Sequence, residues 1–504
     1  MSLSTVYTRA QVGIESPLVQ VEVHLSGGLP SLSLVGLPET AVKESKDRVR
    51  SAILNSHYEF PAKRITINLA PADLPKEGGR YDLAIALGIL ASSDQVPKDK
   101  LTDYEFVGEL TLSGELRPVT GILPTALRAA HAGKTLIVPA GNAGEAALCH
   151  EARILQARSL SEVCSWLHNN ESLPEVSPED APVRTSRLTN DLSEVKGQVG
   201  ARRALEIAAA GQHNLLFIGP PGTGKTMLAS RLPGILPPMS NDEALVAASV
   251  ASISHHSGDW QSRWGQRPFR APHHTSSGVA LVGGGGNPKP GEISLAHGGV
   301  LFLDELPEYS RKVLDVLREP LESGEIVISR ANRSVTYPAS FQLIAAMNPC
   351  PCGYYGDPSG RCQCTPDQIR RYQGQTSGPL LDRIDLHVDV PPVSPALLQQ
   401  APPSEPSTAV RDRVMAARDR QMRRQGCANA CLSGQQRDDV CRLLESDQAW
   451  LLDTIARLNL SARSYHRLLT VARTLADLND ADSIQRQHLM EAIGFRALDR
   501  YRMA

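Results

Sequence analysis

The chain has 504 residues, enough for roughly two to four domains, and 41% of them are hydrophobic, enough to fill packed cores. The formal net charge is −2, so overall charge does not favour nucleic acid, and any DNA contact must come from local basic loops. The N-terminus lacks the basic and apolar regions of a signal peptide, and no apolar run approaches membrane-spanning length. We therefore expect a cytoplasmic protein without a membrane partner. Nine cysteines in such a chain indicate free thiols or a metal rather than structural disulfides.

The first part of the chain, 1–168, mixes short strand-like and helix-like runs. Apolar, β-rich runs predict strands at 18–25, 32–35, 65–69, 106–112 and 135–138. Apolar residues at helical spacing predict helices at 40–54, 82–92 and 123–132. The next segment, 169–187, is rich in Pro, Glu and Ser and poor in apolar residues, which predicts a linker.

A second α/β block is expected over 188–395, where a group of prolines marks another break. From 396 to 504 the apolar pattern becomes helical and predicts a small helical bundle. Its helices are expected at 409–424, 437–458, 462–478 and 484–495.

A phosphate-binding loop is the strongest motif in the chain. The apolar run Leu215–Ile218 precedes Gly219-Pro220-Pro221-Gly222-Thr223-Gly224-Lys225-Thr226, and a helix-like run follows. Glycines let successive backbone N–H groups turn toward a phosphate, and the helix N-terminus adds a positive dipole end. Lys225 can reach the β- and γ-phosphates, and the Thr226 hydroxyl can bind Mg²⁺. A chance match is the alternative, and the flanking strand and helix signals argue against it.

A second motif, Gly299-Val-Leu-Phe-Leu-Asp-Glu305, is an apolar strand that ends in two carboxylates. Asp304 is placed to hold the Mg²⁺ shell, and Glu305 is placed to polarise the attacking water. Alone, the pattern would fit a buried strand with a solvated acidic end. Downstream of a phosphate-binding loop, it predicts ATP hydrolysis that drives motion, because phosphoryl transfer needs positioning and charge neutralisation.

An α/β nucleotide core followed by a helical lid is the layout of an AAA+ ATPase, and three further residues match that class. Asn348, in Ala345-Ala-Met-Asn-Pro349, stands where the class has sensor 1, which orients the lytic water. Arg383 lies in a segment that resembles the arginine-finger segment of the MCM and magnesium-chelatase branch, which reaches the γ-phosphate of a neighbouring subunit. Arg463 matches sensor 2. The alternative for any one of these arginines is a surface charge.

The whole chain resembles the YifB/ComM family of magnesium-chelatase-like AAA+ proteins. The resemblance covers roughly the full length, and its most specific segments are 31–38, 270–275 and 347–353. It implies a homo-hexameric ATP-driven DNA helicase that acts on single-stranded and branched DNA. Such a protein promotes branch migration in homologous recombination during natural transformation, and the resemblance adds recombinase machinery as an expected partner.

The N-terminal part resembles the Lon protease domain, which has the ribosomal S5 domain 2-like fold. Pro75-Lys-Glu-Gly78 and the helix-like run after it look like the Lon nucleophile loop and helix. Arg80 stands where Lon has its serine, and Pro124 stands where Lon has its lysine. Neither side chain can act as an acyl nucleophile or as its base, so the domain is expected to be non-proteolytic.

Four cysteines form the pattern C-x-C, nine residues, C-x-C: Cys350, Cys352, Cys362 and Cys364. The turn-rich segment between the pairs can fold back, and four thiolates so placed suit tetrahedral Zn²⁺. The spacing within each pair is tighter than in the common zinc knuckle, so four reduced loop thiols remain the alternative.

Two loops are candidates for DNA contact. The first, 263–290, carries Arg270 and Lys289 together with Arg263, Arg267, His273 and His274, in the place where helicase-like relatives insert a pore loop. The second, 325–337, is expected to be a β-hairpin with Arg330 and Arg333 at its tip, neutralising phosphates in a central channel. A solvated hairpin with incidental charges is the alternative. No carboxylate or cysteine near the two histidines in sequence completes a metal set, so we expect no metal there.

The sequence thus predicts an ATP- and Mg²⁺-dependent DNA motor that carries Zn²⁺. The rival interpretation is a magnesium-chelatase-like AAA+ chaperone that remodels a protein partner. The basic loops favour DNA, since a protein-threading pore more often presents an aromatic or hydrophobic loop.

Overall fold

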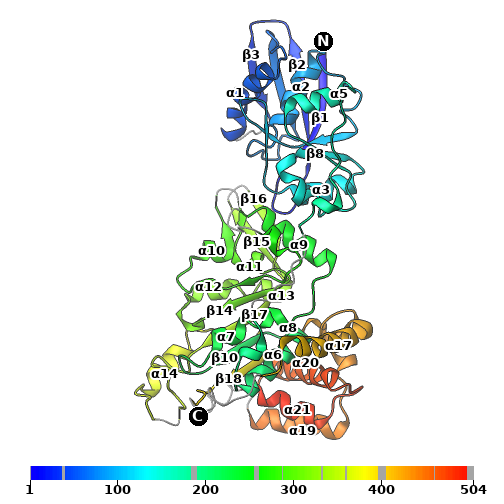
Figure 1. Cartoon of the computed structure of the whole chain (residues 1–504). Coiled ribbons are helices and arrows are strands. Elements are labelled where there is room, and N and C mark those ends of the chain that lie inside the picture. The colour runs from blue at the N-terminus through cyan, green and yellow to red at the C-terminus, as the bar shows by residue number, and fades with distance from the viewer. Residues whose placement is uncertain are drawn as a thin grey trace. The chain divides into compact units, whose positions relative to one another are not determined.

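The structure is a computed structural model that describes residues 2–36, 40–182, 190–254, 260–285, 288–330, 333–357, 360–394, 404–458 and 460–496, without the side chains at 2, 40, 41, 43, 330 and 333. It divides into two compact units (Figure 1). The first comprises Met1–Thr185 and Ala248–Trp264, and the second comprises Ser186–Ala247 and Gly265–Ala504. Both are mixed α/β structures.

The first unit is built on a seven-stranded mixed sheet in the order β3-β4-β2-β1-β5-β8-β9. Its strands are β1 (Ser2–Arg9), β2 (Leu18–Ser26), β3 (Ser31–Val35), β4 (Arg64–Ala70), β5 (Tyr104–Phe106), β8 (Thr135–Pro139) and β9 (Ile154–Ala157). Its longer helices are α1 (Thr40–Asn55), α2 (Asp82–Ser92), α3 (Ile122–His131) and α5 (Leu160–Leu167). Every residue of α2 is buried, as expected for a helix that is apolar on all sides.

The strand expected at 106–112 is interrupted. β5 ends at Phe106, and β6 (Glu109–Leu110) pairs with β7 (Leu116–Arg117) in a separate ribbon. The chain turns at Gly108, whose N–H donates to the Arg80 carbonyl and whose missing side chain leaves room for Leu116. Part of the expected linker also belongs to this unit, because Val176 and Pro174 share backbone hydrogen bonds with β9.

The second unit is built on a five-stranded parallel sheet in the order β11-β14-β17-β10-β18. These strands are β11 (Phe269–Arg270), β14 (Val300–Leu303), β17 (Gln342–Met347), β10 (Leu215–Ile218) and β18 (Leu386–Asp389). The residues of β10, β14 and β17 are all buried, as the continuous apolar runs require when helices cover both faces.

The helices of this unit fall before, between and after the strands. Those in the nucleotide-binding part are α6 (Val199–Gly211), α7 (Lys225–Ala229), α8 (Leu232–Ile235), α10 (Gly278–Val282), α11 (Glu292–Leu295), α12 (Arg311–Val316), α13 (Pro320–Ser323), α14 (Pro366–Gln373) and α15 (Gly378–Leu381). Helix α9 (Asn241–Ser252) is divided between the two units, because its residues from Ala248 on belong to the first. The first of them, α6, shares one hydrophobic core with the sheet and with the C-terminal helices.

The C-terminal part is helical, as expected. Its helices are α17 (Ser407–Gln425), α18 (Gly434–Val440), α19 (Glu445–Arg457), α20 (Ala462–Leu478) and α21 (Arg486–Gly494). The single helix expected at 437–458 is therefore two helices. A Ser433 capping box starts α18, and α19 starts again after Leu444, which has an extended backbone.

Two small hairpins stand apart from the main sheet. The expected hairpin at 325–337 is confirmed as β15 (Glu325–Arg330) and β16 (Arg333–Pro338), with Arg330 paired to Arg333 in register. β12 (Gly283–Gly284) and β13 (Lys289–Pro290) form the second hairpin. The two hairpins are in contact, since the Tyr337 hydroxyl at the end of β16 donates to the carbonyl of Pro288, which precedes β13, at 2.7 Å.

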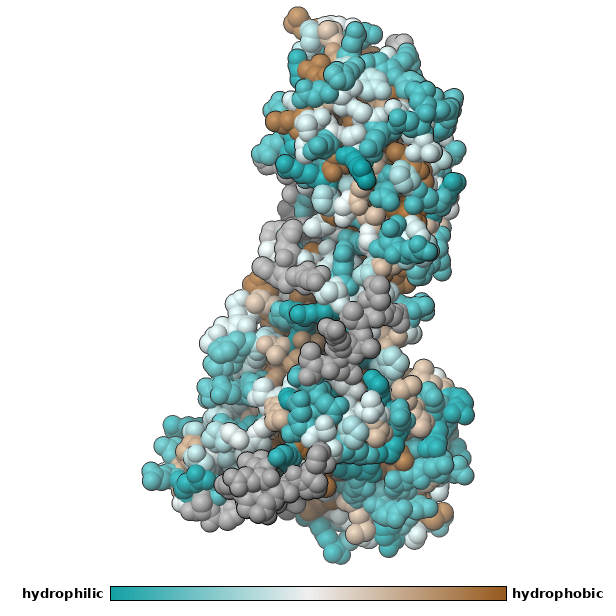
Figure 2. Space-filling model, in the orientation of Figure 1, coloured by the Kyte–Doolittle hydropathy of each residue, from teal (hydrophilic) through white to brown (hydrophobic). Residues whose placement is uncertain are grey.

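The hydropathy of the visible face is mostly hydrophilic, with hydrophobic residues scattered among polar ones (Figure 2). Within the described residues, no helix combines the length and apolar character that crossing a bilayer requires.

Candidate nucleotide-binding site

The expected nucleotide residues gather at the carboxyl ends of neighbouring parallel strands. The phosphate-binding loop follows β10, Asp304 and Glu305 follow β14, and Asn348 follows β17. In open α/β sheets this edge is where ligands bind. A cavity of about 430 Å³ lies there, lined by Pro221–Met227, Asp304, Glu305, Met347 and Asn348.

Glycines shape the phosphate-binding loop. Gly222 and Gly224 have φ values of 78° and 88°, which favour glycine over any other residue. Gly219 passes so close to the neighbouring strand that a Cβ atom would lie 2.2 Å from the Val390 carbonyl oxygen. A Cβ atom at Gly222 would meet nothing within 4 Å, so this part of the loop is open. The loop is thus a tight backbone cradle of the kind that suits a phosphate.

Lys225 is turned into this cradle. Its amine donates to the carbonyls of Gly219 and Pro220, at 2.7 and 2.9 Å, and to Asn348 Oδ1 at 3.0 Å. Burial lowers the pKa of Lys225, while the carboxylates of Asp304 and Glu305 oppose that shift. A buried ammonium held only by neutral oxygens is well suited to an anionic phosphate.

The expected magnesium residues are in contact. The Thr226 hydroxyl donates to Asp304 Oδ2 at 2.6 Å, and the Glu305 N–H donates to the other Asp304 oxygen at 2.9 Å. A hydroxyl and a carboxylate beside a phosphate cradle are the hard oxygen donors that Mg²⁺ takes in nucleotide sites. The donor set therefore fits the expected cation.

Glu305 has a partner that the sequence did not indicate. His274 Nδ1 lies 3.0 Å from Glu305 Oε2. Glu305 is distant from His274 in sequence, and the fold brings it there from the end of another strand. The Tyr309 hydroxyl donates to the Pro272 carbonyl at 2.6 Å and so holds this segment, and burial, with added repulsion from Asp304 and Glu305, raises the pKa of Tyr309 to about 12.

The two arginines expected at the nucleotide lie in different settings. Arg383 is 9% exposed; it donates to the Pro379 carbonyl at 2.5 Å and pairs with Glu322. Arg463 has a side chain that is 64% exposed, with Nη1 3.9 Å from Asp382 Oδ2. Arg463 is thus largely exposed to solvent, whereas Arg383 is held by Glu322 and the Pro379 carbonyl.

A buried carboxylate two residues after Arg383 joins β18 to α20. Asp385 Oδ2 lies 3.1 Å from His213 Nδ1, and Asp385 Oδ1 accepts a hydrogen bond from Arg467. Burial alone would raise the pKa of Asp385, but the charge of Arg467 and the His213 contact outweigh it and hold that pKa well below its usual range. This contact fixes the Arg383 segment to the C-terminal helices.

The four cysteines expected to bind zinc come together at the end of β17. Their sulfur atoms all lie within 4.8 Å of one another, and they form the only metal-competent cluster of Cys, His and acidic side chains in the described chain. Cys350 is buried and the other three are partly exposed.

The basic residues of the first DNA-loop candidate are mostly engaged. Arg270 forms a two-pronged ion pair with Glu292, with both contacts at 2.6 Å. Arg267 donates to the carbonyls of Pro237 and Gly298. Lys289 is exposed on β13. The structure therefore gives Arg270 an intramolecular partner that compensates its charge, and leaves Lys289 on the surface.

The second DNA-loop candidate has the expected backbone. The side chains of Arg330 and Arg333, and the two residues between them, lie outside the described residues. The strands of this hairpin contact the first loop at two points. The Tyr337 hydroxyl donates to the Pro288 carbonyl, and Ile328 lies so close to Gly283 that a Cβ atom there would be 2.7 Å from it.

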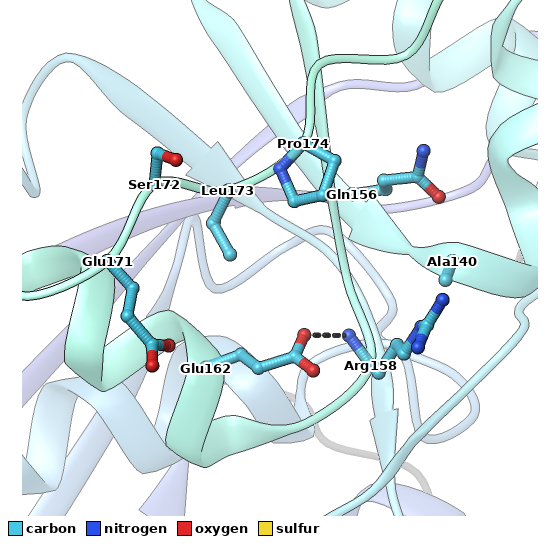
Figure 3. A pocket seen from close by; sticks show the side chains of 8 residues that line it. All are labelled: Ala140, Gln156, Arg158, Glu162, Glu171, Ser172, Leu173 and Pro174. Carbon is cyan, nitrogen blue, oxygen red and sulfur yellow. Dashed lines mark hydrogen bonds between the residues drawn. The ribbon is translucent and has the colours of Figure 1, made fainter.

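In the first unit, Arg80 is buried and donates to Thr125 Oγ1 at 2.9 Å, next to Pro124. Arg80 thus contacts the residue that follows Pro124, so the two positions matched to the Lon serine and lysine in the sequence lie close together. A second cavity of about 430 Å³ lies elsewhere in this unit and includes Arg158, Glu162 and Glu171 (Figure 3). There Glu162 accepts the Arg158 backbone N–H at 2.7 Å.

The phosphate cradle lies beside a hydroxyl and a carboxylate that suit Mg²⁺ and beside an amide at the end of β17. On a parallel sheet, these features define a P-loop ATPase. Three family models match successive parts of the chain: "Magnesium chelatase, subunit ChlI" over 191–398, "Subunit ChlI of Mg-chelatase" over 21–142 and "Magnesium chelatase, subunit ChlI C-terminal" over 404–496.

Among curated relatives, the uncharacterized protein YifB of Escherichia coli is 54% identical, with 99% of this chain and 98% of that protein covered. The competence protein ComM of Haemophilus influenzae is 53% identical, with 99% and 98% covered. The magnesium-chelatase 38 kDa subunit of Rhodobacter capsulatus is 28% identical over 31% of this chain and 49% of its own. The chain belongs to the YifB/ComM family of magnesium-chelatase-like AAA+ proteins, and this membership implies ATPase activity.

Proposed function

We propose that this protein is a hexameric AAA+ motor that uses ATP hydrolysis to move DNA strands and to drive branch migration during recombination of incoming DNA. The observation that carries the proposal is the pairing of a phosphate cradle and magnesium-type oxygen donors with two adjacent hairpins whose sequences include Lys289, Arg330 and Arg333. The similarity to a competence protein supports the DNA assignment.

Each nucleotide-site residue has a separate task. The loop N–H groups and Lys225 bind the phosphates, with Lys225 exchanging its carbonyl partners for phosphate oxygens. Thr226 and Asp304 hold Mg²⁺, which when bound neutralises charge on the β- and γ-phosphates. Glu305 accepts a proton from the attacking water, and Asn348 orients that water.

Two arginines complete the site in this proposal. Arg383 leaves Glu322 when a neighbouring subunit presents its γ-phosphate, and it then stabilises the transition-state charge. Arg463, exposed at the start of α20, contacts the nucleotide as the C-terminal helices close over it as a lid. ATP turnover then alternates contacts at subunit boundaries, which is how a ring converts hydrolysis into movement.

The DNA-facing surface of the proposal consists of the β15–β16 tip, with Arg330 and Arg333, and Lys289 on β13. These residues neutralise phosphates and read no bases. Arg270 contributes by holding β11 to α11 through Glu292, and it touches DNA only if that pair opens.

The other parts of the chain support the motor in this proposal. The first unit is a Lon-like domain without protease activity, because Arg80 and Pro124 replace a nucleophile and its base. It serves assembly or DNA handling. The four cysteines bind one structural Zn²⁺, and the protein works in the cytoplasm.

A second function, remodelling of a protein partner, follows from the magnesium-chelatase similarity. The two are separated by the ATPase rate of the purified protein with and without single-stranded DNA, together with a three-strand branch-migration assay. We expect DNA to raise the rate and strands to exchange. An ATPase that is indifferent to DNA and moves no strand would refute the DNA assignment and leave the chaperone.

The sharpest variant is Arg330→Ala with Arg333→Ala. Each lost phosphate contact lowers the slope of log affinity against log salt by about 0.7 on single strands, so the double variant should lose about 1.4. Basal ATPase should remain, while DNA stimulation falls. Arg442→Ala with Arg457→Ala removes the same charge from exposed positions in the C-terminal part and is the control. An unchanged slope in the hairpin variant would show that these arginines are ordinary surface charges.

A further inference from the structure

The four-cysteine loop is the direct continuation of the strand that carries Asn348. Pro349 alone separates Asn348 from Cys350. The other end of the loop enters α14 at once, since Cys364 precedes Thr365, whose side chain caps that helix. The loop is therefore anchored at both ends in the second unit.

The sulfur positions fit a tetrahedral metal. Cys362 Sγ lies 3.8 Å from Cys350 Sγ and 3.7 Å from Cys352 Sγ. Thiolates at 2.3 Å from one tetrahedral Zn²⁺ lie about 3.8 Å apart. Cys350 Sγ and Cys352 Sγ are separated by 3.3 Å, far beyond the roughly 2.05 Å of a disulfide. The Tyr355 N–H donates to Cys350 Sγ at 3.3 Å, as an outer hydrogen bond to a ligating sulfur would.

This loop also touches the nucleotide site. Gly353 has a φ of 85°, and a Cβ atom there would lie 2.6 Å from Pro221 Cδ in the phosphate-binding loop. Gln373, at the end of α14, donates to the Pro349 carbonyl at 2.9 Å. Asn348 Oδ1 accepts the Lys225 amine at 3.0 Å. The cysteine loop thus contacts the cradle through Pro221 and continues into Asn348.

We propose that Zn²⁺ bound by Cys350, Cys352, Cys362 and Cys364 is a brace for ATP binding, which fixes Asn348 and the Pro221 side of the phosphate-binding loop. The inference rests on the ATP-hydrolysing function proposed above and is independent of DNA. Without the metal, the loop between β17 and α14 loses its only covalent-strength cross-link, because the described cysteines form no disulfide. The chain around Asn348 and Pro221 is then free to shift.

The first test measures zinc and nucleotide on the full-length protein, purified without chelator. Zinc is measured by elemental analysis, and affinity is measured with a fluorescent ATP analogue. We expect about one zinc per chain in the wild type and in Cys431→Ser, which removes an exposed thiol outside the four-cysteine loop. Cys362→Ser with Cys364→Ser should lose the metal and bind the analogue about tenfold more weakly. Wild-type zinc well below one equivalent, or full nucleotide affinity in the metal-free variant, would overturn the proposal.

A second variant tests the contact with the phosphate-binding loop without removing a cysteine, so that loss of affinity through general misfolding can be recognised. Gly353→Ala keeps all four thiols but forces a Cβ atom against Pro221. We expect it to retain one zinc and to bind the analogue more weakly. Unchanged affinity would refute the brace. Lys225→Ala separates the two proposals, because it should lose nucleotide and keep zinc. A zinc-loaded wild type that binds no ATP would instead defeat the proposed function and leave the metal site standing.

Discussion

The buried Asp385 offers the most direct test of how the second unit is held together. Its carboxylate is 3% exposed and faces Arg467, His213 and the backbone N–H of Asn214. Asp385→Ala leaves the Arg467 charge uncompensated. Removing one partner from a buried ion pair costs about 3–5 kcal/mol.

This loss should appear as a lower unfolding temperature of the second unit. At about 2–4 °C per kcal/mol, the expected drop is roughly 6–20 °C. Calorimetry of the full chain measures it, and the transition of the second unit is the one that a bound nucleotide raises. Asp453→Ala is the matched control, because its pair with Arg457 is exposed and contributes about 0–1 kcal/mol. An Asp385→Ala drop no larger than the control's would refute the reasoning.

The pH dependence has a definite sign. The pKa of Asp385 is lower in the folded chain than its ordinary value of 3.8, so the unfolded chain binds its proton first as pH falls. The stabilisation is therefore complete above about pH 4–5 and is lost as pH falls toward the folded pKa. The difference between wild type and Asp385→Ala should stay constant from pH 8 to about pH 5 and shrink below that. A difference that changes near neutral pH would point to another group.

The remaining predictions concern four residues of the nucleotide site. Lys225→Ala should abolish ATP binding, whereas Glu305→Gln should bind ATP and lose turnover; near wild-type hydrolysis in Glu305→Gln would show that another residue activates water. Arg383→Ala should lower turnover with nucleotide affinity mostly kept, and mixing it with Glu305→Gln protein should restore some activity if the arginine acts across a subunit boundary. His274→Ala removes the 3.0 Å contact to Glu305, and one hydrogen bond of about 1 kcal/mol predicts a fall of about fivefold in kcat with KM unchanged. An unchanged kcat would mean that His274 does not position Glu305.

Motifs whose residues are neighbours in sequence were predictable. The phosphate-binding loop and Asp304 each combine an apolar strand with functional residues at its end, and the parallel sheet then brings the strand ends together. The β15–β16 hairpin was also predictable from the sequence, because both strands and the turn lie within one short segment.

Contacts between distant segments were not predictable in the same way. The strand before His274, β11, has only two residues, which is too short to show the alternation of apolar and polar residues that identifies a strand. The local sequence therefore did not indicate that His274 contacts Glu305. The Arg383 pair with Glu322 was missed because the two residues are 61 positions apart in sequence. The strand β1 was also missed, because polar Ser4 and Thr8 alternate with Val6 on its buried face.

The three strands that end at the nucleotide site have a consequence for how ligand is received. β10 is hydrogen-bonded to β17, and β17 is hydrogen-bonded to β14. The phosphate cradle, Asn348 and Asp304 each begin at the end of one of these strands, so the backbone hydrogen bonds of the sheet set the distances between them. That spacing exists before any nucleotide arrives. Binding therefore has to order only a few side chains and not the framework, and little of the interaction energy is lost to immobilising the site. More of the interaction energy is then available to distinguish one bound nucleotide from another, and a protein that works in a nucleotide cycle depends on that distinction.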